Sequence, residues 1–147
     1  MTAKDPSPEE RFTLALHYAY RGWRAALDRG MRDMGISQAG WVAVAYVAKA
    51  TQPISQSELA NQVGVEAATM VSTIDRLEKA GLVERIASET DRRVKHVKVT
   101  PAGQAVYDKV KARADAIRAE VIGKLPPVKL AQATELLEQL QTLIENS

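Results

Sequence analysis

The sequence predicts a mainly α-helical protein of the α+β class, in which one small β-hairpin lies among the helices. Two observations support this prediction. Residues 55–81 carry the start and stop signals of two short helices, and residues 82–100 have the composition of two strands around a basic turn. Outside this segment, apolar residues recur at helical spacing over much longer stretches. We therefore expect a helical pair and a hairpin between long flanking helices.

The first short helix begins with a capping box. The Ser55 hydroxyl can accept from an early amide while Glu58 reaches back to the cap. Gly64 allows a sharp turn into a second helix, which we expect from about Glu66 to Ala80, with a stop at Gly81.

The second helix has two different sides at about 100° per residue. The side expected to pack carries Ala67, Met70, Val71, Ile74 and Leu77. The opposite side, a row of short polar side chains and one cation, carries Thr69, Ser72, Thr73 and Arg76.

The hairpin is predicted from β-branched, partly alternating residues at 82–86 and 95–99. Asp91 precedes Arg92 and Arg93 in the intervening turn, so its carboxylate can hold one Arg side chain extended. From Arg92 to Lys98 there are four cations and no anion.

Each of these features has an ordinary structural explanation. Helical proteins contain similar helix pairs by chance, a Ser/Thr/Arg helix face is usually only solvated, and most Asp-Arg turns are surface ion pairs of small energetic value. The order and spacing of all the features together predict DNA binding by a winged helix-turn-helix.

The N-terminal flank reads as two helices. Ser7 caps the first, with Pro8 at its first position, and this helix is expected to reach about Asp33. Ser37 caps the second, which ends before Pro53.

The C-terminal flank also reads as two helices. Thr100 and Pro101 open one of them, and the segment 125–127, Leu-Pro-Pro, forces a corner before the last. That last helix carries a nearly heptad apolar seam formed by Leu130, Ala133, Leu137, Leu140 and Ile144. Such a seam packs either within its own subunit or against a second one.

Composition is compatible with one globular domain. The chain has 147 residues, of which 46% are hydrophobic and 26% charged, and its net charge of +2 is too small to identify a nucleic-acid partner. It has no Cys, which excludes disulfides and thiolate metal sites, and it has no apolar run long enough for a membrane span. Without a signal-peptide core at the N-terminus, a cytoplasmic location is expected.

Catalytic patterns are lacking. His17 and His96 lie on separate elements, and there is no Ser-His-Asp set, Gly-rich phosphate loop or spaced group of metal ligands. We expect a protein that is not an enzyme and that needs no metal or cofactor.

The segment 91–100, Asp-Arg-Arg-Val-Lys-His-Val-Lys-Val-Thr, carries a family resemblance. It is similar to the wing of the MarR family of winged-helix transcription regulators, and within that family most closely to the SlyA-like branch. Supporting similarities occur at 57–60, 72–83, 21–25 and 37–41. The resemblance covers nearly the whole chain.

The resemblance implies one MarR-type domain over residues 1–147. Its DNA-binding region would span about 36–100, and its dimerisation helices about 7–33 and 101–147. Leu137, Leu140 and Ile144 would then lie in the interface of a homodimer. A two-fold protein implies a pseudo-palindromic double-stranded DNA site.

The resemblance also implies roles for single residues. Thr69, Ser72, Thr73 and Arg76 would meet the major groove, and Arg93, steadied by Asp91, would enter the minor groove. Phosphate contacts would come from Arg92 and Lys95 and from the amides near Ser55 and Gln56. The SlyA-like branch has Arg where this chain has Ser72, and Ala67 and Ala68 offer no polar reach, so base readout is expected to be sparse.

Members of the family bind small aromatic or phenolic effectors and are usually repressors. The residues expected to line such a site are Tyr18, Arg21, Trp23, Arg24 and Trp41, although aromatic residues at helical spacing are more often plain core. A second function class stays open. It is an effector-independent architectural or anti-silencing DNA binder, or a winged helix that binds proteins.

Overall fold

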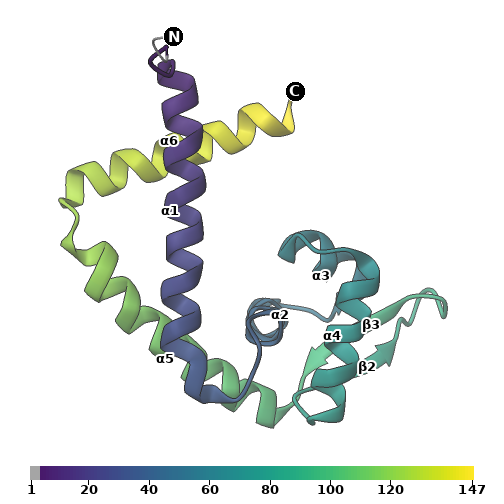
Figure 1. Ribbon diagram of the computed structural model, residues 1–147. Helices are drawn as coiled ribbons and strands as arrows, with labels where there is room; N and C mark the ends of the chain where they lie inside the picture. The colour runs from purple at the N-terminus through teal and green to yellow at the C-terminus, as the bar shows by residue number, and fades with distance from the viewer. Residues whose placement is uncertain (1–3) are drawn as a thin grey trace. The chain divides into compact units, whose positions relative to one another are not determined.

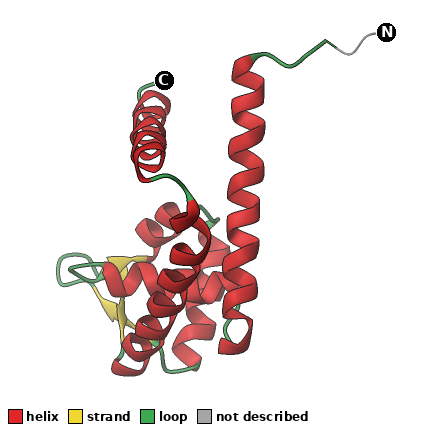
Figure 2. Ribbon diagram, turned by 90° about the vertical axis from the view of Figure 1, so that its left-hand side faces the viewer, coloured by secondary structure: helices red, strands yellow, loops and turns green. Residues whose placement is uncertain are grey.

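The structure, a computed structural model, describes residues 4–147 (Figure 1). The elements in chain order are α1 (Pro8–Met31), the 3-10 turn η1 (Arg32–Met34), α2 (Gln38–Lys49), β1 (Ile54–Ser55), α3 (Gln56–Val63), α4 (Ala67–Lys79), β2 (Val83–Ala87), β3 (Lys95–Val99), α5 (Pro101–Val121), the 3-10 turn η2 (Ile122–Lys124) and α6 (Pro127–Glu145). Strands form only a small part of this mostly helical chain (Figure 2). The predicted fold class is confirmed. The chain divides into two compact units, one ending at Arg113 and the other spanning Ala114–Ser147.

Local capping interactions explain where the helices begin. The hydroxyl groups of Ser7 and Ser37 each accept a hydrogen bond from the amide three residues later. At α3 the predicted capping box is present, because Ser55 Oγ accepts from the Glu58 amide at 3.1 Å and Glu58 accepts from the Ser55 amide. Gly64 ends α3 with φ of 81°, which lets the chain turn at once toward α4.

The core of the first unit lies where α2, α3 and α4 meet the sheet. Its buried apolar side chains are Ala43, Val44, Val47, Ile54, Leu59, Ala60, Met70, Ile74, Leu77, Val83 and Val97. Because α4 contributes three of them, one side of this helix is fixed against the core and the other side is left for solvent or a partner.

The sheet has three antiparallel strands in the order β1-β3-β2, whereas the sequence predicted only the two strands of the hairpin. The additional strand β1 pairs Ile54 with Val97 and Ser55 with His96. A strand of two residues is too short to show a period-2 pattern, so its sequence gave no signal. As a result, α3 starts directly from the edge of the sheet.

The start of α5 is tied closely to the turn that follows α4. Thr100 Oγ1 donates to the Gly81 carbonyl at 2.6 Å and accepts from the Gly103 amide at 3.0 Å. The Thr100 amide donates to the Leu82 carbonyl at 3.1 Å. A Cβ atom on Gly103 would lie 1.9 Å from the Leu82 oxygen, so only Gly fits at this contact.

Further along α5, Arg113 joins this helix to the end of α1. Its Nη1 donates to the Gly30 carbonyl at 2.6 Å and to Asp33 Oδ1 at 2.9 Å. Hydrogen bonds and charge from Arg113 hold the pKa of Asp33 below its ordinary value. The first unit thus includes a charged link between its N-terminal helix and α5.

In the second unit, α5 ends in the turn η2, and Leu125 is extended ahead of Pro126 and Pro127 as the sequence predicted. Large apolar side chains of α6 are exposed in the single chain: Val128, Leu136, Leu137, Leu143 and Ile144. Within residues 4–147, no helix is both long enough and apolar enough to cross a membrane.

Candidate nucleic-acid interface

The outward side of α4 differs from the predicted one at three positions. Thr73 was expected to face outward but is only 4% exposed, and its hydroxyl donates to the Thr69 carbonyl at 2.9 Å. With its hydroxyl satisfied inside the helix, Thr73 packs much as a Val would. Val71 was expected in the core but is 40% exposed. The predicted faces of Thr73 and Val71 were therefore wrong. Ala67 was also expected to pack against the core, but it is exposed.

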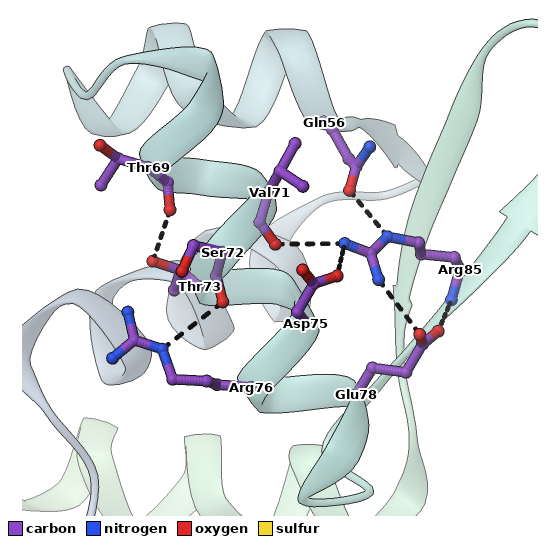
Figure 3. A network of polar contacts seen from close by, with 9 residues as sticks. All are labelled: Gln56, Thr69, Val71, Ser72, Thr73, Asp75, Arg76, Glu78 and Arg85. Carbon is purple, nitrogen blue, oxygen red and sulfur yellow. Dashed lines mark hydrogen bonds and ion pairs between the residues drawn. The ribbon is translucent and has the colours of Figure 1, made fainter.

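The other residues predicted for this side are exposed. Thr69, Ser72 and Arg76 are accessible on α4, and Arg76 Nε donates to the Ser72 carbonyl at 3.5 Å (Figure 3). This contact leaves the two terminal guanidinium nitrogens of Arg76 beyond the helix backbone. The accessible surface offers two short hydroxyl groups and one cation, together with small apolar side chains.

The loop between β2 and β3 is held by its own hydrogen bonds. The buried Ser88 hydroxyl accepts from the amides of Thr90 and Asp91, each at 3.3 Å. The Ser88 amide donates to the Val94 carbonyl, and the Val94 amide donates to the Asp91 carbonyl. This loop, residues 88–94, is the tip of the wing, and its shape is set before any partner binds.

Asp91 holds Arg93 at the wing tip as predicted. Asp91 Oδ1 accepts from the Arg93 amide at 3.0 Å and from Arg93 Nε at 3.2 Å, and Oδ2 accepts from Nη2 at 3.3 Å. These hydrogen bonds hold the pKa of Asp91 below its ordinary value. The Arg93 side chain is nevertheless 91% exposed, so its stem projects into solvent. Arg92 and Lys95 are also exposed.

The start of α3 carries fewer free donors than the sequence suggested. The Ser55 amide already donates to Glu58 Oε2 at 3.4 Å within the capping box. The Gln56 side chain accepts from Arg85 Nε at 2.8 Å. The Glu58 carboxylate therefore lies where a phosphate would have to approach the Ser55 amide.

Arg85, on β2, is a residue that the sequence analysis did not single out. Its guanidinium group contacts Gln56, the Val71 carbonyl, Asp75 and Glu78, all in one network (Figure 3). One signal was available in the sequence. Alternation along β2 places Arg85 on the same face as buried Val83, and a cation in such a position requires partners.

The five predicted effector residues lie on α1 and α2. Tyr18, Arg21 and Arg24 are exposed, Trp23 is half-buried and Trp41 is buried. Arg24 lies 5.5 Å from the ring centre of Tyr20, also on α1. Trp41 Nε1 is buried without a hydrogen-bond partner among the described residues. A hollow of about 250 Å³ lies beside α4 and is lined by residues from the segment 35–82. None of the five predicted effector residues lines it.

Comparison with known proteins identifies the family. Residues 47–95, which include α3, α4 and most of the wing, match the MarR family model. The chain is also similar to transcriptional regulator PA3341, whose crystal structure is known. The two sequences are 34% identical, the structures have a TM-score of 0.86, and the match covers 92% of this chain and 99% of PA3341. The chain belongs to the MarR family. As a MarR-family transcriptional regulator with a winged-helix DNA-binding fold, it is not an enzyme.

Two more distant structures share the MarR fold. CouR from Rhodococcus jostii RHA1, bound to p-coumaroyl-CoA, is 21% identical with a TM-score of 0.80, over 92% of this chain and 95% of CouR. The S. aureus MepR-DNA complex is 15% identical with a TM-score of 0.78, over 89% of this chain and 96% of MepR. At these identities the likeness extends to the fold alone.

Proposed function

We propose that this protein is a homodimeric repressor that binds a pseudo-palindromic double-stranded DNA site and is released by a small aromatic or phenolic effector. The observation that carries the proposal is the pairing of two exposed elements on one winged helix. The first is the polar side of α4, and the second is the preformed wing tip with Arg93 projecting from it. Helix and wing are the parts with which this fold meets the major and minor grooves.

The proposed contacts follow from exposure and chemistry. Thr69, Ser72 and Arg76 meet base edges or nearby phosphates in the major groove, and Arg93, held by Asp91, enters the minor groove. Phosphate contacts come from Arg92, Lys95 and the Gln56 amide at the start of α3, whereas the Ser55 amide is left out because it already donates to Glu58. Thr73 is left out because it is buried.

The proposed dimer rests on exposed apolar side chains at both ends of the chain. In α1 these are Phe12, Leu14, Leu16, Tyr18 and Tyr20. In α6 they include Leu137 and Ile144, which belong to the apolar seam, and Leu143, which precedes Ile144 in the sequence. Exposed apolar surface on each of these helices is costly in water, and a second copy of the chain would cover it. The single-domain organisation over residues 1–147 and the assignment to the SlyA-like branch stay predictions.

The proposed effector site lies on α1 and α2 and uses Tyr18, Arg21, Trp23, Arg24 and Trp41. Its support is the buried Trp41 N–H, a donor suited to a carboxylate or phenol oxygen that has no partner among residues 4–147, together with the exposed cations Arg21 and Arg24 on α1. CouR, which shares the fold, is bound to p-coumaroyl-CoA in its crystal structure. An effector that prefers the state unable to bind DNA would release the protein from its operator.

Selection of duplex fragments from a random library tests this function. The full chain should enrich one pseudo-palindromic site, bind it more tightly than scrambled duplex, and lose affinity steeply as salt rises. Aromatic acids and phenols should quench Trp fluorescence and weaken binding by a coupling of about 1 to 3 kcal/mol. Enrichment of no site would indicate a protein-binding winged helix, and binding unaffected by any effector would indicate an architectural role.

A further inference from the structure

Arg85 connects three parts of the DNA-binding unit. Its Nε donates to Gln56 Oε1 at 2.8 Å, at the start of α3. Its Nη2 donates to the Val71 carbonyl at 3.2 Å and lies 2.6 Å from Asp75 Oδ1, both on α4. Glu78, further along α4, accepts from Arg85 Nη1 at 3.1 Å and from the Arg85 amide at 2.9 Å. All three guanidinium nitrogens are engaged inside the protein.

These contacts hold α4 at two separate points. Val71 and Glu78 are seven residues apart, which is about 10 Å along a helix axis. A single contact would leave the helix free to pivot, whereas two contacts at this spacing also fix its direction. The group that makes them belongs to β2, the strand that leads into the wing tip.

Arg85 is not placed to contact DNA itself. Its side chain is 18% exposed, against 91% for Arg93, and its nitrogens are already occupied. Its charge nevertheless matters for DNA, because it is paired with Asp75 and Glu78 on the helix that faces the duplex. The Asp75 side chain is 61% exposed. Without the Arg85 guanidinium group, these two carboxylates would repel nearby phosphates, and the side-chain contacts from β2 to Val71, Asp75 and Glu78 would be lost.

We propose that Arg85 is a positioning residue for DNA recognition, which holds α4, the start of α3 and the wing hairpin in one arrangement. In this arrangement the exposed side of α4 and Arg93 reach adjacent grooves together. Loss of the Arg85 guanidinium group therefore removes most of the benefit of Arg93, although the two side chains lie at different places on the hairpin. The inference rests on the DNA-binding function proposed above.

A double-mutant cycle between Arg85→Met and Arg93→Ala tests the inference. Met keeps an apolar stem and removes the guanidinium group. The probe is the duplex fragment enriched by the wild-type chain, and affinity is measured by fluorescence anisotropy at one salt concentration. Circular dichroism identifies a temperature at which every variant is folded. In the wild-type background, Arg93→Ala should weaken binding about tenfold, and in the Arg85→Met background about threefold or less.

Lys98→Met provides the matched control, because Lys98 lies on the same hairpin and pairs at 3.6 Å with Glu84, which alternation places on the opposite face of β2 from Arg85. In that background Arg93→Ala should cost the full tenfold or so. If Arg85→Met does not fold, Glu78→Gln replaces it, since this change weakens two of the contacts to Arg85. It should reduce the Arg93 effect in the same direction.

The outcomes separate the two proposals. Equal fold losses from Arg93→Ala in the wild-type and Arg85→Met (or Glu78→Gln) backgrounds overturn the positioning role while leaving DNA binding intact. A smaller loss in those backgrounds, together with a full loss in the Lys98→Met background, supports it. A wild-type chain that enriches no duplex overturns the proposed function and this inference with it.

Discussion

Replacement of Gly103 with Ala tests the close approach between α5 and the turn that follows α4. The new Cβ would lie 1.9 Å from the Leu82 oxygen and 2.6 Å from Val99 Cγ2, whereas real Cβ contacts essentially never fall below 3.0 Å. Overpacking of this kind costs about 1 to 3 kcal/mol. If α5 moves away, the two hydrogen bonds from Thr100 to the Gly81 and Leu82 carbonyls also weaken, at about 1 kcal/mol each.

The expected destabilisation is thus about 3 to 5 kcal/mol, which lowers the melting temperature of a chain of this size by about 10 to 15 °C. Thermal unfolding followed by circular dichroism measures it. Gly22→Ala is the matched control, because its added Cβ would meet nothing within 4 Å apart from its chain neighbours and the backbone of its own helix. Ala in a helix interior should stabilise by about 0.4 to 1 kcal/mol. A Gly103→Ala variant that melts with the wild type would refute the close approach.

Four further predictions concern DNA binding, the core, assembly and protonation. Arg93→Ala should weaken binding to the selected duplex by about 1 to 3 kcal/mol and lower the salt slope by about one, as measured by anisotropy. Leu77→Ala should lower the free energy of unfolding by about 2 to 5 kcal/mol in urea titrations, because its side chain is buried. A chain ending at Lys129 should sediment as a monomer or aggregate, and a stable dimer would place the interface elsewhere. NMR titration of the carboxyl groups should give Asp91 a pKa below 3.8, and this pKa should rise toward 3.8 in the Arg93→Ala variant. The pairing of Asp91 with Arg93 stabilises the fold above a pH of about 4, and this stabilisation is lost as pH falls through the lowered pKa.

Features that depend on neighbours in sequence were predictable. Helix starts at Ser7, Ser37 and Ser55 follow from side chains that reach an amide three residues later. The contact between Asp91 and Arg93 joins residues two apart in a turn. In each case the interacting groups are at most three residues apart, so a local sequence pattern is enough to predict the contact.

Features that depend on packing between distant segments were not predictable. A helical projection placed Thr73 outside and Val71 inside, because it cannot show which side of α4 the core will cover. The Thr hydroxyl also counts as polar in such a projection, although it is satisfied within the helix. Arg85 meets Gln56 across 29 residues of sequence, so its role required the fold.

Ser55 belongs to two elements at once, and this has a consequence for local unfolding. It pairs with His96 in the sheet, and its hydroxyl caps α3. Opening of the sheet edge therefore removes the cap, and fraying of α3 exposes the sheet edge. Hydrogen exchange at α3 and at the pairing between β1 and β3 should follow one shared opening free energy, while the wing tip opens separately at lower cost. One serine thus makes a helix and a strand a single cooperative unit.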